Sequence, residues 1–140
     1  MRVKPIRVYV ENSVLGGYYD EIFKEHTKKL FELFIDGTYK PVISDHVLFE
    51  LNNGAPQEVI DVLRLITYEY HETNEEMEFL ANLYISEGVV TEKYKNDALH
   101  VAIATVLGVD LLVSWNCTHI VNYDRLRKVN NINYREGYNF

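Results

Sequence analysis

The sequence predicts an α/β fold, a three-layer α-β-α sandwich with a central, mainly parallel sheet. Short β-branched segments alternate with amphipathic segments, which is typical of parallel strands covered by helices on both faces. The length of 140 residues fits one domain, residues 1–140. A hydrophobic content of 47% is enough for a core at this length, so we expect folding without disulfides.

The first half of the chain predicts two strands with their following helices. Ile6–Val10 (IRVYV) is a β-branched run that predicts a buried strand. Residues 20–36 carry apolar side chains at helical spacing. Residues 41–44 (PVIS) predict the second strand, and a helix over 45–52 follows at once, with Asp45 placed to cap it.

The middle of the chain continues the same alternation. Pro56 stands where the first turn of a helix tolerates proline. Residues 67–71 form a candidate third strand. Asn74 is placed to cap the next helix, and Gly88 is placed to end it.

The last third of the chain carries its most apolar segments. Asn96 or Asp97 opens a helix that runs over 98–107. Residues 110–114 (DLLVS) predict a fourth strand that is buried on both faces. A last helix around 120–129 and a short strand in the tail complete the prediction.

The composition bears on nucleic-acid binding, on disulfide formation and on membrane insertion. With 14 basic and 21 acidic residues the net charge is −7, which counts against tight, autonomous binding to nucleic acid. It still permits an enzyme that gathers acids at a metal site. The single Cys117 cannot form an internal disulfide, and we see neither a signal peptide nor an apolar run near the ~20 residues of a membrane span. We therefore expect a soluble, cytoplasmic protein.

Polar side chains follow the predicted strands where ligands usually bind in such sheets, outside the carboxyl ends. Glu11 follows the first strand, Glu50 lies on the helix after the second, and Asp97 begins the apolar helix. Asn116 follows the fourth strand. Clustered carboxylates repel one another unless a cation neutralises them, and oxygen ligands suit Mg²⁺ or Mn²⁺. Such a metal activates water for attack on a phosphodiester.

Each of these residues also has an ordinary structural interpretation. Glu50 by itself fits a solvated surface charge, Asp97 a helix cap, and Asn116 a turn residue. Glu11 is the hardest to explain in this way, because a carboxylate that ends a buried strand needs a partner. Trp115 fits the core as well as a base-stacking role, and the basic residues 93, 95, 125, 127 and 128 fit a solvated face as well as phosphate contacts.

Three segments together resemble the PIN domain over nearly the whole chain. They are VYVENSVLGGYYD, VISDHVLFELNNGAP and KNDALHVAIATVLGVDLLVSWNCTHIVN. The third is the most specific, and it is similar to PIN proteins such as the toxins of bacterial VapBC pairs. The resemblance implies a Mg²⁺- or Mn²⁺-dependent endoribonuclease that acts on RNA, is inhibited by a small antitoxin protein and forms a homodimer.

The resemblance also assigns roles to residues. It places Glu11, Glu50 and Asp97 at three metal-binding acids, and Asn116 at the fourth acidic position. Ser13 matches the hydroxyl residue beside the first acid. Two further residues are candidate supporting residues. Asn12 lies between Glu11 and Ser13, and His100 comes three residues after Asp97. The family usually has Asp where Glu11 stands, and the uncharged Asn116 favours one bound metal over two.

Two other functions remain open on the sequence. A non-catalytic PIN domain that serves as a protein-interaction module fits the departures at Glu11 and Asn116. A receiver-like signalling domain also gathers acids and Mg²⁺ at strand ends, but it needs an aspartate ending a central strand. The predicted strands end at Ser44 and Ser114 instead.

Overall fold

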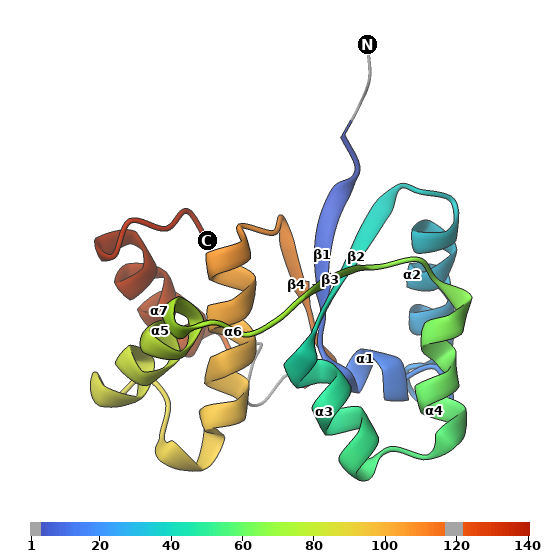
Figure 1. Ribbon diagram of the computed structural model, residues 1–140, viewed down its shortest axis with the longest axis horizontal. Coiled ribbons are helices and arrows are strands. Elements are labelled where there is room, and N and C mark those ends of the chain that lie inside the picture. The colour runs from blue at the N-terminus through green and yellow to red at the C-terminus, as the bar shows by residue number, and fades with distance from the viewer. Residues whose placement is uncertain (1–3, 117–121) are drawn as a thin grey trace. The chain divides into compact units, whose positions relative to one another are not determined.

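The computed structural model describes residues 4–116 and 122–140 (Figure 1). The chain divides into two compact units. Unit 1 comprises residues 1–72 and 110–115, and unit 2 comprises residues 73–109 and 116–140. Unit 1 contains the sheet, and the described elements of unit 2 are helical.

The sheet of unit 1 has four strands in the order β3-β2-β1-β4, and every neighbouring pair is parallel. Its central strands are buried because their β-branched and aromatic side chains fill the core, with Val8, Tyr9 and Val10 all fully buried. The α/β class and the parallel sheet are therefore confirmed, whereas the three-layer arrangement stays a prediction. The strands are β1 (Ile6–Val10), β2 (Tyr39–Ser44), β3 (Glu69–His71) and β4 (Leu111–Val113).

Two helices of unit 1 begin where strands end, at the carboxyl edge of the sheet (Figure 1). The first of them, α1 (Asn12–Gly16), follows β1 directly. The second, α3 (Asp45–Gly54), follows β2, and the hydroxyl of Ser44 accepts a hydrogen bond from the Val47 amide as its N-cap. The remaining helices of the unit are α2 (Lys24–Ile35), α4 (Gln57–Asp61) and the 3-10 helix η1 (Val62–Leu65).

Unit 2 is built around α6 (Lys95–Leu107), which is buried over most of its length. Asn133 of the last helix is fully buried. Its amide nitrogen donates to Thr105 Oγ1 at 3.2 Å and to the Phe140 carbonyl at 2.9 Å, and its Oδ1 accepts from the Tyr84 hydroxyl. These bonds connect three segments of unit 2. The other helices are α5 (Glu75–Ser86), η2 (Glu92–Tyr94) and α7 (Tyr123–Arg135).

Several expected element boundaries are wrong, each for a local reason. Ser44 caps α3 in place of Asp45, because the extended backbone at Ser44 aims its hydroxyl at the Val47 amide. Asp97 does not cap α6, which already begins at Lys95 and holds Asp97 in its first turn. A carboxylate there still interacts favourably with the helix dipole.

The chain also departs from expectation at both ends of the sequence. Helix α1 lies in a stretch for which we expected no helix. Strand β4 is an edge strand with Leu111 43% exposed, so it is not buried on both faces. Helix α7 runs to Arg135, and none of the described residues after it forms a strand. No described helix is long and apolar enough to cross a membrane.

Candidate metal centre

Glu11 occupies the carboxyl end of β1 and is only 6% exposed. It is the N-cap of α1: its Oε2 accepts from the Ser13 amide at 3.0 Å and from the Ser13 hydroxyl at 2.5 Å. The Ser114 hydroxyl donates to the same oxygen at 2.9 Å. The buried carboxylate that the sequence left without a partner is therefore held by two serines and one backbone amide.

The ends of β1 and β4 lie side by side at this point of unit 1. The Glu11 amide donates to the Val113 carbonyl at 3.2 Å, so the pairing of the two strands continues one residue past β1. The Trp115 amide donates to the Ser13 hydroxyl at 2.9 Å. This pairing brings Ser114 to Glu11 across more than a hundred residues of sequence, and we did not single out Ser114 as a site residue because only the strand register reveals it.

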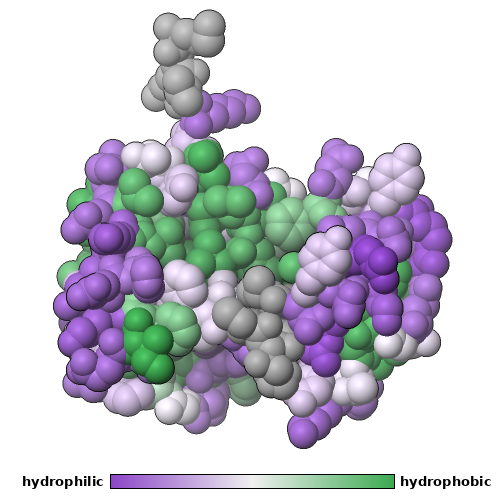
Figure 2. Space-filling view, turned by 180° about the vertical axis from the view of Figure 1, so that it is seen from behind, coloured by the Kyte–Doolittle hydropathy of each residue, from purple (hydrophilic) through white to green (hydrophobic). Residues whose placement is uncertain are grey.

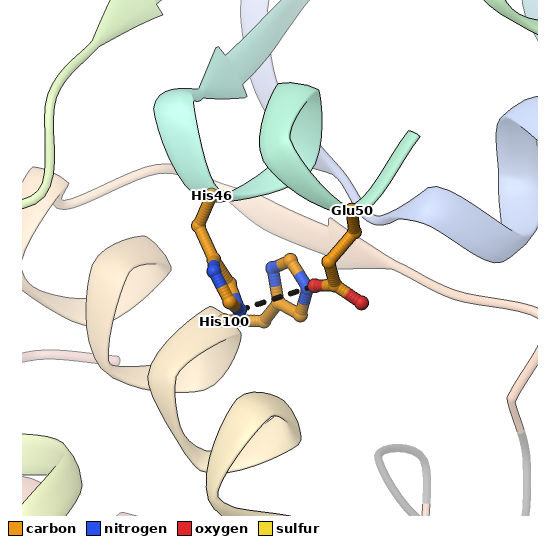
Figure 3. A group of neighbouring side chains, drawn as sticks. All are labelled: His46, Glu50 and His100. Carbon is orange, nitrogen blue, oxygen red and sulfur yellow. Dashed lines mark ion pairs between the residues drawn. The ribbon is translucent and has the colours of Figure 1, made fainter. Parts of the chain in front are cut away.

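Glu50 lies on α3 together with His46, one helical turn earlier (Figure 3). His46 Nε2 and Glu50 Oε1 are 3.1 Å apart, and the two side chains are 12% and 31% exposed. The i,i+4 spacing places both on one face of the helix. The sequence pattern alone predicts no role for His46.

The pKa of the buried Tyr9 hydroxyl depends on the acidic charges at this edge of the sheet. The hydroxyl forms a 2.9 Å hydrogen bond with Ser44 Oγ. Burial is the largest cause that raises the pKa of Tyr9 above its ordinary value, and the bond to Ser44 opposes it. The charges of three acids raise this pKa further: Glu11, Glu50 and Asp45. The charges of Glu11 and Glu50, which follow β1 and β2, therefore both act on the same buried hydroxyl.

The donor groups of unit 1 fit a hard divalent cation. Asn12, beside Glu11, donates its amide to the Val47 carbonyl at 3.0 Å, which fixes the direction of its side chain. The Oδ1 of Asn12 is buried and has no hydrogen-bond partner among the described residues. A buried acceptor next to a carboxylate is the kind of oxygen that a bound cation or its water satisfies.

The other predicted site residues belong to unit 2. Asp97, in the first turn of α6, lines a small hollow together with Arg125 of α7. The Arg125 guanidinium lies 5.3 Å from the centre of the Tyr94 ring, and the Lys93 ammonium lies 5.4 Å from it. His100, also drawn in Figure 3, is 1% exposed on α6.

The structure thus assigns the predicted residues to two sets. Glu11, Asn12, Ser13 and Glu50 lie at the carboxyl edge of the sheet in unit 1, and Asp97, His100 and Asn116 belong to unit 2. The convergence of both sets on one metal stays a prediction. Asn116 is half-buried.

Trp115 has contacts that support a packing role. Its ring stacks parallel to Phe23 with ring centres 5.5 Å apart. Its indole Nε1 donates to Thr27 Oγ1 at 3.0 Å. Both partners belong to unit 1, so the ring ties the end of β4 to the start of α2. Cys117 and the neighbouring His119 lie outside the described residues.

The fold has a counterpart among solved structures. No family model matches the sequence, and no curated protein matches it. The chain is similar to the crystal structure of VapC20 from Mycobacterium tuberculosis, a sarcin–ricin loop cleaving toxin. The two are 18% identical with a TM-score of 0.60, and the match covers 79% of this chain and 91% of that chain. At this identity the likeness establishes a shared α/β fold.

Proposed function

We propose that this protein is a metal-dependent endoribonuclease of the PIN type, the toxin of a toxin–antitoxin pair. The observation that carries the proposal is that Glu11 follows β1 and Glu50 lies on the helix after β2, at the carboxyl edge of a parallel sheet, and that the charges of both raise the pKa of the buried Tyr9. The sequence resemblance to VapBC toxins and the fold shared with VapC20 support it independently. The expected partners are an RNA substrate, a small antitoxin and a second copy of the chain.

Glu11, Glu50 and Asp97 would hold Mg²⁺ or Mn²⁺, and Asn116 would supply a neutral acceptor at the fourth position. A divalent metal held there would supply a polarised phosphoryl group and a water of lowered pKa that can attack as a nucleophile at neutral pH. The described hydrogen bonds of Glu11 fall on Oε2, so we assign Oε1 to the metal. Ser13 and Ser114 hold the carboxylate in one orientation before the metal arrives.

Contacts to the RNA backbone are assigned to the cations around Tyr94. Lys93 and Arg125 both lie against this ring, and Arg125 shares a hollow with Asp97. Cations held in place by an aromatic ring lose less side-chain entropy when they bind a phosphate. The net charge of the chain is −7, which repels RNA phosphates. Lys93 and Arg125 would reduce this repulsion locally, where the RNA approaches the acidic centre.

The test is cleavage of a fluorescent single-stranded RNA as a function of Mg²⁺ or Mn²⁺ concentration. We expect Glu50→Gln and Asp97→Asn each to lower the rate by about a hundredfold or more, because each removes a charge that stabilises the metal. The double variant should be no slower than either single variant, since ligands of one metal act as a unit. Glu58→Gln, on the exposed surface of α4, is the matched control and should leave the rate unchanged.

The second candidate is a protein-interaction module with the same fold. Asn116 favours this function, because a neutral residue at the fourth position lowers the negative charge of the centre. The acidic balance of the chain also favours it, because a net charge of −7 opposes binding to RNA. The two functions give opposite results in one assay. Wild-type protein that binds the metal normally and cleaves no RNA would make the interaction module the better description.

A further inference from the structure

His46 lies at the candidate metal centre without a role in the mechanism proposed above. It is the second residue of α3, two positions after the Ser44 cap, and its side chain is 12% exposed. Its Nε2 points toward Glu50, as the close view shows (Figure 3). The partly exposed carboxylate of Glu50 and the nearly buried imidazole of His46 therefore lie on the same face of α3.

The spacing of the two donor atoms is that of an imidazole–carboxylate ion pair, and it is also compatible with neighbouring ligands on one metal. A small divalent cation binds its ligands at about 2.1 Å, so two ligand atoms at right angles to each other are about 3.0 Å apart. His46 Nε2 and Glu50 Oε1 are 3.1 Å apart. A cation could bind both atoms without a change of helix geometry.

The local scaffold holds this pair in place. Ser44 caps the first turn of α3, which includes His46. Asn12 of α1 donates to the Val47 carbonyl in the same turn at 3.0 Å. Both contacts restrain the backbone turn from which the imidazole projects.

A second His–Glu pair in unit 1 shows what a purely structural pair looks like. His71 Nε2 lies 2.6 Å from Glu69 Oε2, and Arg7 Nη2 binds the same oxygen at 2.5 Å. A permanent cation therefore already compensates that carboxylate. Glu50 lies on the helix that follows β2, and its charge, together with those of Glu11 and Asp45, raises the pKa of the buried Tyr9 hydroxyl. Like charges gathered in this way favour a bound cation.

We propose that His46 and Glu50 bind the same divalent cation, and that the imidazole makes this centre selective for Mn²⁺ over Mg²⁺. The inference rests on the proposed function, in which Glu50 is a metal ligand. Mg²⁺ binds oxygen ligands almost exclusively, whereas Mn²⁺, which also prefers oxygen, accepts an imidazole nitrogen more readily than Mg²⁺ does. A nitrogen ligand thus stabilises the Mn²⁺ complex much more than the Mg²⁺ complex.

The experiment is calorimetric titration of the metal-free protein with MnCl₂ and with MgCl₂. We expect the wild type to bind Mn²⁺ more tightly than Mg²⁺, and His46→Gln to lower the affinity for Mn²⁺ by about tenfold or more with a much smaller change for Mg²⁺. His46→Asp replaces nitrogen with oxygen and should shift the preference toward Mg²⁺. His71→Gln is the matched control and should change neither affinity.

Pulsed electron paramagnetic resonance of the Mn²⁺ complex gives a second readout that needs no RNA. A bound imidazole produces a nitrogen modulation of the echo, which should be present in the wild type and in His71→Gln and lost in His46→Gln. Thermal melts of each variant establish that it is folded before titration.

The outcomes separate this inference from the proposed function. Equal losses of Mn²⁺ and Mg²⁺ affinity in His46→Gln would mean that His46 only orients Glu50, which overturns the inference and leaves the nuclease proposal standing. An unchanged affinity ratio with a persistent nitrogen signal also overturns it. If the wild type binds neither metal, or if Glu50→Gln binds both as the wild type does, the metal centre itself and the proposed function are wrong.

Discussion

Ser114 follows β4 directly and donates to Glu11 Oε2 at 2.9 Å, with only 6% of its surface exposed. A hydrogen bond to a charged group contributes about 1.5–3 kcal/mol, and here it also selects the orientation of a carboxylate that we assign to a metal. The position illustrates how a residue without catalytic chemistry of its own determines the geometry of one that has it.

We predict that Ser114→Ala weakens metal binding by about tenfold, in the range typical of residues that orient a metal ligand. The reason is that the Glu11 carboxylate keeps its bonds from Ser13 but loses the hydrogen bond from Ser114. Titration calorimetry with Mn²⁺ measures the change. Ser86→Ala, which removes an exposed hydroxyl bound to the Leu83 carbonyl, is the control. Unchanged metal affinity in Ser114→Ala would show that Ser13 alone orients the carboxylate.

Glu69 on β3 gives a prediction about pH. The hydrogen bond from Arg7 is the largest cause that lowers the pKa of Glu69, burial opposes it, and His71 lowers the pKa further. A carboxyl group whose pKa is lower in the folded state stabilises the fold above its unfolded pKa of about 4.3. That stabilisation is lost as the pH falls through the lower, folded value.

We therefore expect Glu69→Gln to reduce the free energy of unfolding at pH 7 by up to about 1 kcal/mol, a modest value because the pair is partly exposed. The difference from wild type should shrink as the pH falls below about 4 and vanish at lower pH. Urea denaturation at a series of pH values measures it. A difference that stays constant down to pH 2 would assign the effect to packing and not to charge.

At the scale of elements, the backbone of Gly17 at the end of α1 packs closely against the side chains of Trp115 and Thr27. A Cβ added to Gly17, just after α1, would lie 2.6 Å from Trp115 Nε1 and 2.8 Å from Thr27 Oγ1. Those two atoms are themselves hydrogen-bonded to each other, so neither moves freely. The glycine is needed here for space, because its backbone angles are ordinary helical ones.

We predict that Gly17→Ala lowers the free energy of unfolding by about 1–3 kcal/mol, the usual effect of overpacking. Gly16→Ala is a close control, because nothing lies within 4 Å of its added methyl group. Trp115 is the single tryptophan, so its fluorescence reports the disturbance directly. Equal stability of the two variants would mean that the indole relaxes away from Gly17 without loss.

At the scale of the whole molecule, β4 is an edge strand, and no other described strand pairs with its outer side. An unpaired edge strand with apolar side chains is a template for association unless another chain covers it. Leu111 on β4 is 43% exposed and Ile6 on β1 is 40% exposed. The view from behind shows apolar surface gathered below the N-terminal segment (Figure 2). Apolar patches of more than a few hundred Å² seldom stay uncovered in solution.

We predict that the protein is a homodimer and that Leu111→Lys shifts it toward the monomer, because a charge on an edge strand opposes pairing. Light scattering should give twice the 16.4 kDa mass of the chain for the wild type. Leu65→Lys introduces the same charge at the exposed η1 helix and should remain dimeric. A monomer mass for the wild type at high concentration would contradict the prediction.

The sequence by itself determined the alternation of strands and helices in this protein. β-Branched runs such as IRVYV and turn residues such as Gly88 act locally, so their effect is visible without a fold. The same holds for the Asn74 cap, whose side chain accepts from the Met77 amide. It also placed Glu11 and Glu50 after successive strands, which is enough to expect them at one edge of a parallel sheet.

Tertiary structure decided which side chains meet there. Ser114 reaches Glu11 only because β4 pairs with β1 in one register, and a single sequence contains no information on register between strands a hundred residues apart. The edge position of β4 likewise depends on strand order and not on its apolar composition. His46 looks like any histidine near a helix start until its nitrogen is found 3.1 Å from Glu50, because that distance depends on two side-chain rotamers.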